Sequence, residues 1–238
     1  MTQAALPVRA VVLDFDGLIV DTETPIFESW RKAYRRCGHD LGLDVWQHAL
    51  GTHGGFDPLE HLDSLCHGAL DREATLAEVK AATARGCDGQ PLMPGVERLL
   101  RDAEALGLGR AVASSSSFGW VDGWLRRHGI RELLQVVVAR DDVRRVKPDP
   151  ELFLLAASRL GVHPAGCLVF EDSPNGMRAA LDAGMRCAAV PNALTRPLAR
   201  PEVDLVLESL AERPLAEVLR AVERARAAAV RVAEQDGA

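Results

Sequence analysis

Short apolar runs that end in acidic or hydroxyl residues recur along this chain, and segments with helix signals separate them. Residues 10–13 form such a run, and it stops at Asp14-Phe15-Asp16-Gly17. This pattern is typical of a buried strand that ends in a loop. We therefore predict strands here and at the similar runs that follow, which are residues 110–113, 133–138, 167–170, 186–190 and 204–207. Several of these strands end in polar residues, which are expected on the same side of a sheet.

The segments between these runs carry the start and stop signals of helices. Asp149-Pro150 precedes a helical stretch that ends near Gly161, and Ser173-Pro174 precedes one that ends near Gly184. A Ser or Asp cap supplies a hydrogen-bond acceptor, proline suits the first turn, and glycine permits a left-handed exit. Strands that alternate with helices predict an α/β fold with a Rossmann-like, doubly wound parallel sheet.

One region breaks this alternation. Residues 24–90 contain no convincing strand, and helical segments are predicted instead at residues 24–38, 57–68 and 71–85. We therefore expect an α-helical domain at residues 24–90, inserted after the first strand of a core domain that comprises residues 1–23 and 91–238. A further helix is predicted from Pro214 to about Glu234.

Composition narrows the expected partners of the chain. Its 238 residues include 28 basic and 34 acidic side chains, which give a formal charge of -6. The chain therefore lacks the excess positive charge that is typical of a nucleic-acid-binding protein. No apolar run reaches the roughly 18 residues of a membrane helix. The five cysteines are scattered without a metal or disulfide pattern. We expect a cytoplasmic protein with a small-molecule partner, present as a monomer or a weak homo-oligomer.

Two acidic clusters are predicted to meet at one edge of the sheet. Asp14 and Asp16 follow the first strand, and Glu171-Asp172-Ser173-Pro174 follows a later one. Ligands of open α/β sheets bind outside the carboxyl ends of the strands. Crowded carboxylates repel one another unless a cation neutralises them, and hard oxygen ligands suit Mg²⁺. Taken alone, the first pair could equally be a solvated turn, and the second cluster could in part be a helix cap.

Two further features favour an anionic ligand. Ser114 to Ser117 follow the predicted strand at residues 110–113, where hydroxyls and backbone amides at a helix start can hold a phosphate. Lys147 precedes a helix and could neutralise a phosphoryl group. A serine run is more often a linker or cap, and a loop lysine is usually solvated. All four features lie at strand ends of one sheet, however, and together they supply the positioning and charge neutralisation that phosphoryl transfer needs.

Four segments of the chain resemble, in order, the four motifs of the haloacid-dehalogenase superfamily. They are residues 14–22, Ser114, Lys147-Pro148 and Glu171-Asp172-Ser173. The resemblance covers nearly the whole chain, and the helical insert is similar to the C1 cap of the phosphoglucomutase-like branch. It implies a Mg²⁺-dependent phosphatase of a small phosphorylated metabolite, such as a sugar phosphate.

The resemblance also implies roles in catalysis. Asp14 would be the nucleophile that forms an aspartyl phosphate. Asp16 would protonate the leaving oxygen and then activate water. Thr22 would help to orient Asp16.

The same resemblance implies a metal site and a phosphate site. Mg²⁺ would be bound by the Asp14 carboxylate, by the backbone carbonyl of Asp16 and by Asp172. Glu171 would act as an indirect ligand. The transferring phosphoryl group would be held by Ser114, Ser115 and Lys147.

Several alternatives share parts of this pattern. An aspartate at position 16 argues against the metal-free dehalogenases. A β-phosphoglucomutase would carry a histidine where this chain has Pro25-Ile26, and Lys-Asn where it has Ser117-Phe118. It would also carry a Ser-Arg pair in the cap. The missing groups favour hydrolysis and leave the mutase as the alternative, while a phosphorylatable receiver-like regulatory protein, which lacks a cap, is the non-enzyme alternative.

The loop at residues 51–57 is the expected source of substrate contacts from the cap. His53 and Phe56 are the candidates, although a solvated loop histidine is about equally expected at position 53. The tryptophans are expected in the core or at a domain interface rather than at a binding site. They are Trp30, Trp46, Trp120 and Trp124.

Overall fold

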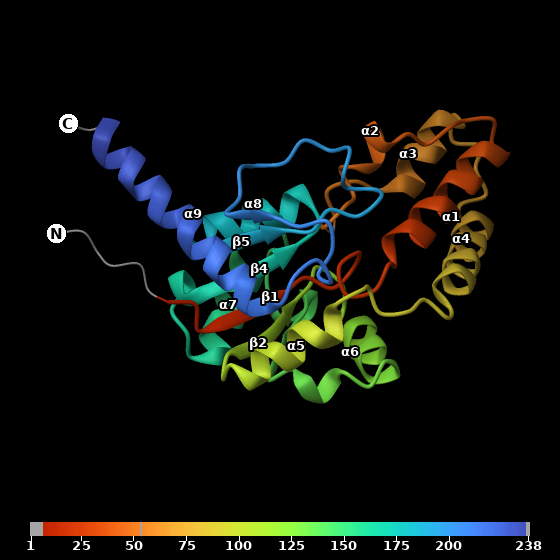
Figure 1. The fold of residues 1–238 in the computed structure, drawn as a ribbon. Coiled ribbons are helices and arrows are strands. Elements are labelled where there is room, and N and C mark those ends of the chain that lie inside the picture. The colour runs from red at the N-terminus through yellow and green to blue at the C-terminus, as the bar shows by residue number, and fades with distance from the viewer. Residues whose placement is uncertain (1–6, 53, 237–238) are drawn as a thin grey trace.

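The computed structural model describes residues 7–52 and 54–236, and Figure 1 shows its fold. Within these residues, six strands form one sheet in the order β3-β2-β1-β4-β5-β6, and every neighbouring pair is parallel. The predicted fold class, a Rossmann-like doubly wound α/β sheet, is confirmed. The strands are β1 (Ala10–Leu13), β2 (Gly109–Ala113), β3 (Val136–Val138), β4 (Cys167–Glu171), β5 (Arg186–Ala189) and β6 (Leu205–Val206).

The strand order reverses at β1. The chain moves outward from β1 to β2 and β3, and it then returns to β4 on the other side of β1 before it continues to β5 and β6. A reversal of this kind leaves a crevice outside the carboxyl ends of the two central strands, where ligands of open α/β sheets bind. The fold therefore places the ends of β1 and β4 at the expected binding position.

Helices cover both faces of the sheet. Val11 and Leu13 of β1 pack into an apolar cluster with α5 (Val96–Ala105), α6 (Phe118–Arg127) and α9 (Leu215–Asp236). Ala10 and Val12 point to the opposite face and pack with α7 (Glu151–Leu160) and α8 (Pro174–Asp182). This burial on two sides explains why the strands are continuous apolar runs rather than alternating ones.

The predicted serine cap is present at α8, whereas the N-cap residue of α7 is Pro150, which makes no side-chain capping hydrogen bond. The Ser173 hydroxyl accepts a hydrogen bond from the Gly176 amide at 3.1 Å. The Asp149 carboxylate accepts one from the Glu151 amide at 3.0 Å. Ser173 therefore caps α8, and Asp149 binds the first amide of α7 from the preceding loop.

The strand predicted at residues 133–138 is shorter in the structure. β3 begins at Val136, and a 3₁₀ turn, η1 (Arg131–Leu133), precedes it. The Leu133 amide donates to the Ile130 carbonyl and the Leu134 amide to the Arg131 carbonyl. Leu133 and Leu134 nevertheless pack in the same cluster as α5 and α6. An apolar run of this length does not distinguish a strand from a buried turn.

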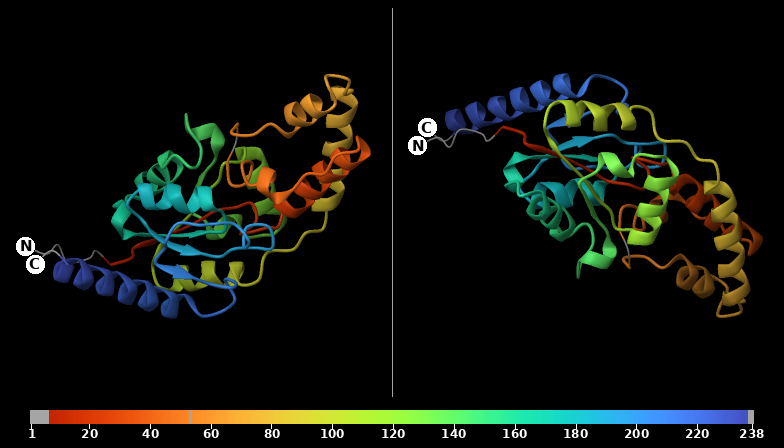
Figure 2. Two further views of the ribbon diagram at one scale, coloured as in Figure 1. Left: turned by 90° about the horizontal axis from the view of Figure 1, so that it is seen from above. Right: turned by 90° about the horizontal axis from the view of Figure 1, so that it is seen from below.

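The segment between β1 and α5 forms a helical insert with an apolar cluster of its own. Figures 1 and 2 show this insert to one side of the sheet, at the end opposite α9. As predicted, the described part of residues 24–90 contains no strand. The division into domains at residues 24 and 90 stays a prediction. The helices of the insert are α1 (Glu23–Arg36), α2 (Leu43–Trp46), α3 (Pro58–Leu65) and α4 (Arg72–Cys87).

The last helix, α9, matches the helix predicted from Pro214 to about Glu234. Arg226 of α9 donates to Asp204 at 2.7 Å and ties the helix to the loop before β6. Across the part of the chain that the structure describes, no helix combines the length and the apolar character needed to cross a membrane.

Three tryptophans lie in the apolar clusters, as predicted. Trp30 and Trp46 are buried in the cluster of the insert, and Trp124 of α6 is buried in the core cluster. Trp120 is only partly buried against the same core cluster. Its indole N–H also contacts Asp16.

Candidate active site

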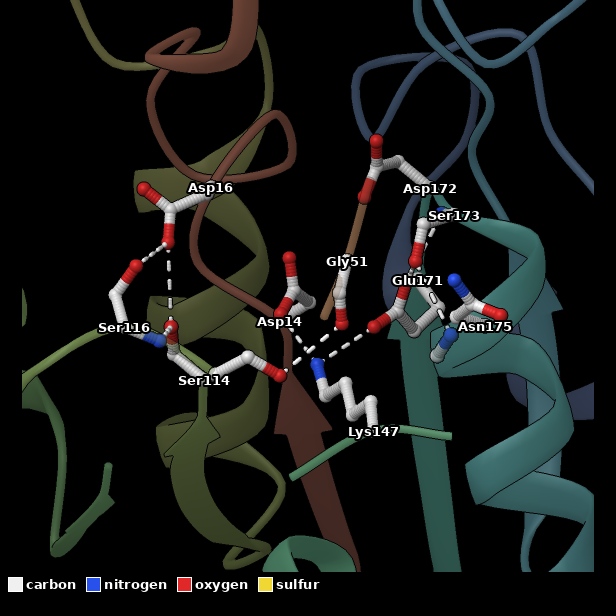
Figure 3. A network of polar contacts seen from close by, with 12 residues as sticks. Asp14, Asp16, Gly51, Ser114, Ser116, Lys147, Glu171, Asp172, Ser173 and Asn175 are labelled. Atoms are coloured by element: carbon white, nitrogen blue, oxygen red, sulfur yellow. Dashed lines mark hydrogen bonds and ion pairs between the residues drawn. The ribbon is translucent and has the colours of Figure 1, made fainter. Parts of the chain in front are cut away.

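The carboxyl edge of the sheet brings the predicted motif residues together, as Figure 3 shows. Asp14 follows β1, Ser114 follows β2, and Glu171 ends β4. Because β1 lies between β2 and β4, Asp14 stands between the other two. The backbone ladder continues to this point, since the Asp14 amide donates to the Phe170 carbonyl at 3.0 Å. Strand pairing therefore sets the relative positions of these residues.

Lys147 joins two of the carboxylates. It lies in the loop before α7, and its side chain is 0% exposed. Its Nζ donates to Asp14 Oδ1 and, at 2.6 Å, to Glu171 Oε1. Burial opposes the positive charge, but the two carboxylates outweigh burial and raise the pKa of Lys147 above its ordinary value. The lysine is therefore a buried cation that ties its loop to β1 and β4.

Asp14, Glu171 and Asp172 form an acidic cluster in which one oxygen from each residue lies within 4.8 Å of the others. Burial raises the pKa of Asp14 to about 8, against the attraction of Lys147. Burial also raises the pKa of Asp172 well above its ordinary value, and the neighbouring Glu171 and Asp14 add to this shift. Within this cluster the carboxylates outnumber the buried lysine, so a divalent cation would relieve their repulsion.

The donor atoms of this cluster fit Mg²⁺, which prefers oxygen ligands. Glu171 uses Oε1 for Lys147 and Oε2 for the amide and hydroxyl of Ser173, at 2.9 and 3.0 Å. Glu171 is therefore better placed to support the cluster than to bind a cation directly. Asp14 and Asp172 are the carboxylates suited to direct contact.

Asn192 contacts this acidic cluster, although the sequence patterns do not single it out. It follows β5, and its Nδ2 donates to Asp172 Oδ2 at 2.7 Å and to the Gly17 carbonyl at 3.2 Å. Its Oδ1 accepts from the amides of Leu194 and Thr195 at 2.9 and 3.1 Å. Asn192 thereby holds Asp172 against the loop after β1. The available signal was a polar residue two positions after the strand predicted at residues 186–190.

The carboxylate of Asp16 turns toward the loop after β2 (Figure 3). Its Oδ1 accepts from the Thr22 hydroxyl at 2.7 Å and from the Trp120 indole at 2.9 Å. Its Oδ2 accepts from the Ser116 hydroxyl at 2.6 Å and from the Ser114 hydroxyl at 3.2 Å. Both carboxylate oxygens of Asp16 therefore accept hydrogen bonds, and the Ser114 hydroxyl is one of the donors.

Trp120 and Ser116 are contacts of Asp16 that the sequence analysis missed. Trp120 was expected in the core or at an interface, and its ring does pack on the core cluster, but its N–H is used at the site. A tryptophan near the start of a helix carries no signal for such a role, because large aromatic residues are usually packing residues. Ser116 lies in the serine run but was not distinguished from its neighbours.

The loop after α2 contacts the core through two backbone carbonyls, which we call the docking contact. The Ser115 hydroxyl donates to the Gly51 carbonyl at 3.0 Å, and Asn175 Nδ2 donates to the Leu50 carbonyl at 2.9 Å. Gly51 has a φ of 67°, and a Cβ there would lie 2.1 Å from Ser173 Oγ. The loop can approach the core this closely because residue 51 is glycine.

The remaining predicted contact residues have different outcomes. Ser115 binds the Gly51 carbonyl, so its phosphate contact stays a prediction. His53 lies outside the described residues. Phe56 packs beside His61, with 5.4 Å between ring centroids, at the margin of the cluster of the insert. A substrate contact by His53 or Phe56 therefore also stays a prediction.

A cavity of about 460 Å³ lies between the insert and the core, and we call it the insert cavity. Ile26 and Trp30 of α1 and Val79 of α4 line it from the insert, and Ser116 and Trp120 line it from the core. Its wall is therefore mainly apolar on one side and carries hydroxyls on the other. Two of the residues that contact Asp16, Ser116 and Trp120, therefore line this cavity.

A second cavity, of about 700 Å³, has a cationic lining, and we call it the arginine cavity. Thr52 and Arg140 line both cavities, so the two flank the docking contact. The arginine cavity also reaches the loop that carries Lys147 and suits an anionic ligand. Its basic residues are Arg140, Arg144, Arg145, Lys147 and Arg178.

A carboxylate paired with a buried lysine, next to further carboxylates at the switch point of a parallel sheet, is the arrangement of an α/β enzyme active site. The chain belongs to the haloacid dehalogenase-like hydrolase family, which matches residues 8–184. The family resemblance identified from the motifs is confirmed, and the protein is a hydrolase.

Two relatives carry names that describe phosphatases. The phosphatase-named YhcW of Bacillus subtilis (strain 168) is 43% identical over 212 residues, which cover 89% of this chain and 96% of that protein. The fructose-1-phosphate phosphatase YqaB of Escherichia coli (strain K12) is 34% identical over 179 residues, which cover 74% of this chain and 92% of that protein. A solved structure, CbbY from Rhodobacter sphaeroides in complex with phosphate, is similar with a TM-score of 0.67 and 29% identity, covering 86% of this chain and 96% of that one.

Proposed function

We propose that this protein is a Mg²⁺-dependent phosphatase that hydrolyses a small phosphorylated metabolite through an aspartyl phosphate at Asp14. The observation that carries this proposal is the buried contact of Asp14 with Lys147 beside Glu171 and Asp172. Phosphoryl transfer requires mainly positioning and neutralisation of charge. The nucleophile, a buried cation and a set of oxygen ligands for Mg²⁺ lie together here.

Asp14 would attack the phosphorus atom through one carboxylate oxygen while the bond from phosphorus to the leaving oxygen breaks. Burial raises the pKa of Asp14 to about 8, and the contact with Lys147 favours the ionised nucleophile. Mg²⁺, held by Asp14, Asp172 and the backbone carbonyl of Asp16, would neutralise charge on the phosphoryl group. Glu171 would hold Lys147 in place through its 2.6 Å contact.

Asp16 would act as the acid and then as the base. It would donate a proton to the leaving oxygen, and it would later take a proton from the water that attacks the aspartyl phosphate. The second step releases inorganic phosphate and restores Asp14. Thr22, which contacts Asp16 at 2.7 Å, would orient the carboxylate.

The phosphoryl group would be held from the β2 side. Ser114 and Ser115 would donate to its oxygens, together with Lys147. Ser114 must then turn away from Asp16, which it contacts at 3.2 Å. Ser115 must likewise release the Gly51 carbonyl, which it contacts at 3.0 Å.

The two cavities favour a small anionic substrate. The arginine cavity offers positive charge next to the Lys147 loop, and the insert cavity offers about 460 Å³ for a leaving group. The substrate in the name of YqaB, fructose 1-phosphate, supports a sugar phosphate. The phosphate in the CbbY structure also supports an anion site in this fold.

A panel of phosphomonoesters, assayed with Mg²⁺ and with EDTA, tests the proposal. We expect cleavage only with Mg²⁺, and we expect Asp14→Asn to lower kcat by at least about 1,000-fold, because it removes the nucleophile. Asp182→Asn is the matched control. Asp182 lines the arginine cavity outside the acidic cluster, so its change should leave kcat within about threefold.

Two results would contradict the proposal. One is full activity of Asp14→Asn, and the other is failure of the wild-type protein to cleave any ester of the panel. Conversion of β-glucose 1-phosphate to the 6-phosphate, with a bisphosphate primer, would support the mutase alternative instead.

A further inference from the structure

The indole of Trp120 contacts the carboxylate of Asp16 and also lines the insert cavity. Its Nε1 donates to Asp16 Oδ1 at 2.9 Å, and Trp120 lines the same cavity as Trp30. Trp120 thus lies between the proposed acid and the space proposed for the leaving group. Neither the sequence motifs nor the names of the relatives assign it a role.

Packing along α6 aims the indole at Asp16. Trp120 meets Trp124 edge to face, with 5.8 Å between the ring centroids and 72° between the planes. Trp124 in turn stacks on His128 at 5.7 Å and 14°, and Arg127 lies over its ring at 5.0 Å. Residues four apart share one face of a helix. The row of rings therefore restricts the orientation of the Trp120 N–H.

The indole differs chemically from the other groups that contact Asp16. The hydroxyls of Thr22, Ser114 and Ser116 can donate or accept, whereas the indole N–H can only donate. The Ser114 contact is 3.2 Å long, and Ser114 is also proposed to bind the phosphoryl group. When Ser114 turns to the phosphoryl oxygens, the indole can still hold Oδ1. A proton on Asp16 is then favoured on Oδ2, because the indole at Oδ1 cannot accept it, whereas the Ser116 hydroxyl, 2.6 Å from Oδ2, can.

We propose that Trp120 is a positioning residue for Asp16. Its N–H keeps Oδ1 as an acceptor and directs the proton-bearing Oδ2 to the leaving oxygen. In the first step, the proton on Oδ2 passes to the leaving oxygen as its bond to phosphorus breaks. In the second step, Oδ2 takes a proton from the attacking water. The proposal rests on the proposed function, because it concerns the proton transfer by Asp16.

The dependence of the rate on the leaving group tests this role. Phenyl phosphate and p-nitrophenyl phosphate have similar shapes, but the phenolate needs a proton more than the p-nitrophenolate does when it leaves. We expect Trp120→Phe to lower kcat/KM for phenyl phosphate by about tenfold. The same change should lower kcat/KM for p-nitrophenyl phosphate by less than about threefold. A residue with only a packing role would affect both esters equally.

Trp124→Phe is the matched control, because it removes an indole that is buried in the core cluster but keeps an aromatic ring against Trp120. It should leave the ratio of the two kcat/KM values unchanged. A second variant carries benzothienylalanine at position 120, which keeps the ring shape but has sulfur in place of the N–H. It should reproduce the selective loss even if the smaller phenylalanine perturbs folding.

Three outcomes would overturn the role of Trp120. Equal losses for both esters would overturn the positioning role alone, and so would unchanged rates with benzothienylalanine at position 120. A wild-type protein that cleaves neither ester, nor any other ester of the metabolite panel, would overturn the proposed function together with this role.

Discussion

The carboxyl edge of the sheet and the helical insert line the same cavities, but the sheet edge has a buried ion pair whereas the insert has an ion pair at its surface. At the sheet edge, Lys147 and Glu171 are each 0% exposed, and Nζ lies 2.6 Å from Oε1. In the insert, Arg35 pairs with Asp40 at the surface, at 3.1 Å, around an apolar cluster. Loss of one partner from a buried pair is costly, whereas exposed pairs contribute little to stability.

The two regions also contribute different groups to the docking contact. The insert contributes the backbone carbonyls of Leu50 and Gly51, and the core contributes the side chains of Ser115 and Asn175. Ile26, on the insert wall of the insert cavity, packs with the apolar cluster of the insert. We therefore expect the chemistry at the sheet edge and the selection of substrate shape at the insert.

Two lysines test the difference between the sheet edge and the insert, and they should give the largest effect. Lys147 belongs to the sheet edge, and Lys80 lines the insert cavity. Lys147→Ala should lower kcat by about 100- to 1,000-fold, since it removes the charge beside the nucleophile. It should also lower the free energy of unfolding by about 3–5 kcal/mol, because Asp14 and Glu171 lose their buried partner. Lys80→Ala should change KM by about threefold and leave kcat nearly constant.

Steady-state kinetics and urea unfolding of both variants provide the measurement. A larger fall in kcat for Lys80→Ala than for Lys147→Ala would contradict the assignment of the chemistry to the sheet edge.

The docking contact offers a test of intermediate size. Gly51→Ala should lower kcat/KM by about tenfold, because its Cβ would lie 2.1 Å from Ser173 Oγ and 2.8 Å from Ser173 Cβ. The loop would then lose its contacts with Ser115 and Asn175. Gly54→Ala is the control, since Gly54 has a φ of 83° but no atom within 4 Å of its added Cβ.

Comparison of the two glycine variants separates the close contact from backbone strain. Gly54→Ala should cost about 1 kcal/mol of stability through its left-handed conformation and should retain its kcat/KM. Equal kinetic losses in the two variants would show that strain, rather than the approach to Ser173, limits position 51.

The smallest expected effect concerns pH and stability. Burial raises the pKa of Asp14 from 3.8 to about 8 in the metal-free folded chain, so the folded state retains a proton that the unfolded state releases. The stability from this group is present at low pH and is lost as the pH rises toward 8. Without metal, Tm of the wild type should fall relative to that of Asp14→Asn by about 2–4 °C between about pH 7 and about pH 8.

Mg²⁺ should reverse this trend, because it binds the ionised carboxylates and stabilises the folded state most at the higher pH. Thermal unfolding of the wild type and of Asp14→Asn, each with EDTA and with Mg²⁺, provides the measurement. An identical pH dependence of Tm in the two metal-free proteins would contradict the raised pKa.

Much of the core could be predicted because its signals are local. Asp14, Ser114 and Glu171 each follow an apolar run or end it, and the carboxyl ends of parallel strands meet at one edge of a sheet. Ser173 caps α8 as its sequence pattern indicates. The prediction was less accurate at residues 133–138, where the run of apolar residues includes the buried turn η1.

The contacts around Asp16 and at the docking loop could not be predicted in this way. Trp120 lies 104 residues from Asp16, and Asn175 lies 125 residues from Leu50. Their local patterns indicate only a helix, and the direction of each side chain depends on how α6, α8 and the insert pack on the sheet.

The sequence by itself therefore determined the sheet, its acidic edge and the family, because strand ends, helix caps and motif order are encoded by neighbouring residues. The tertiary structure decided which donors contact Asp16, how Asn192 holds Asp172, and how closely Gly51 approaches Ser173. These contacts depend on distances between elements that are remote in the chain, and those distances are set only when the elements pack together.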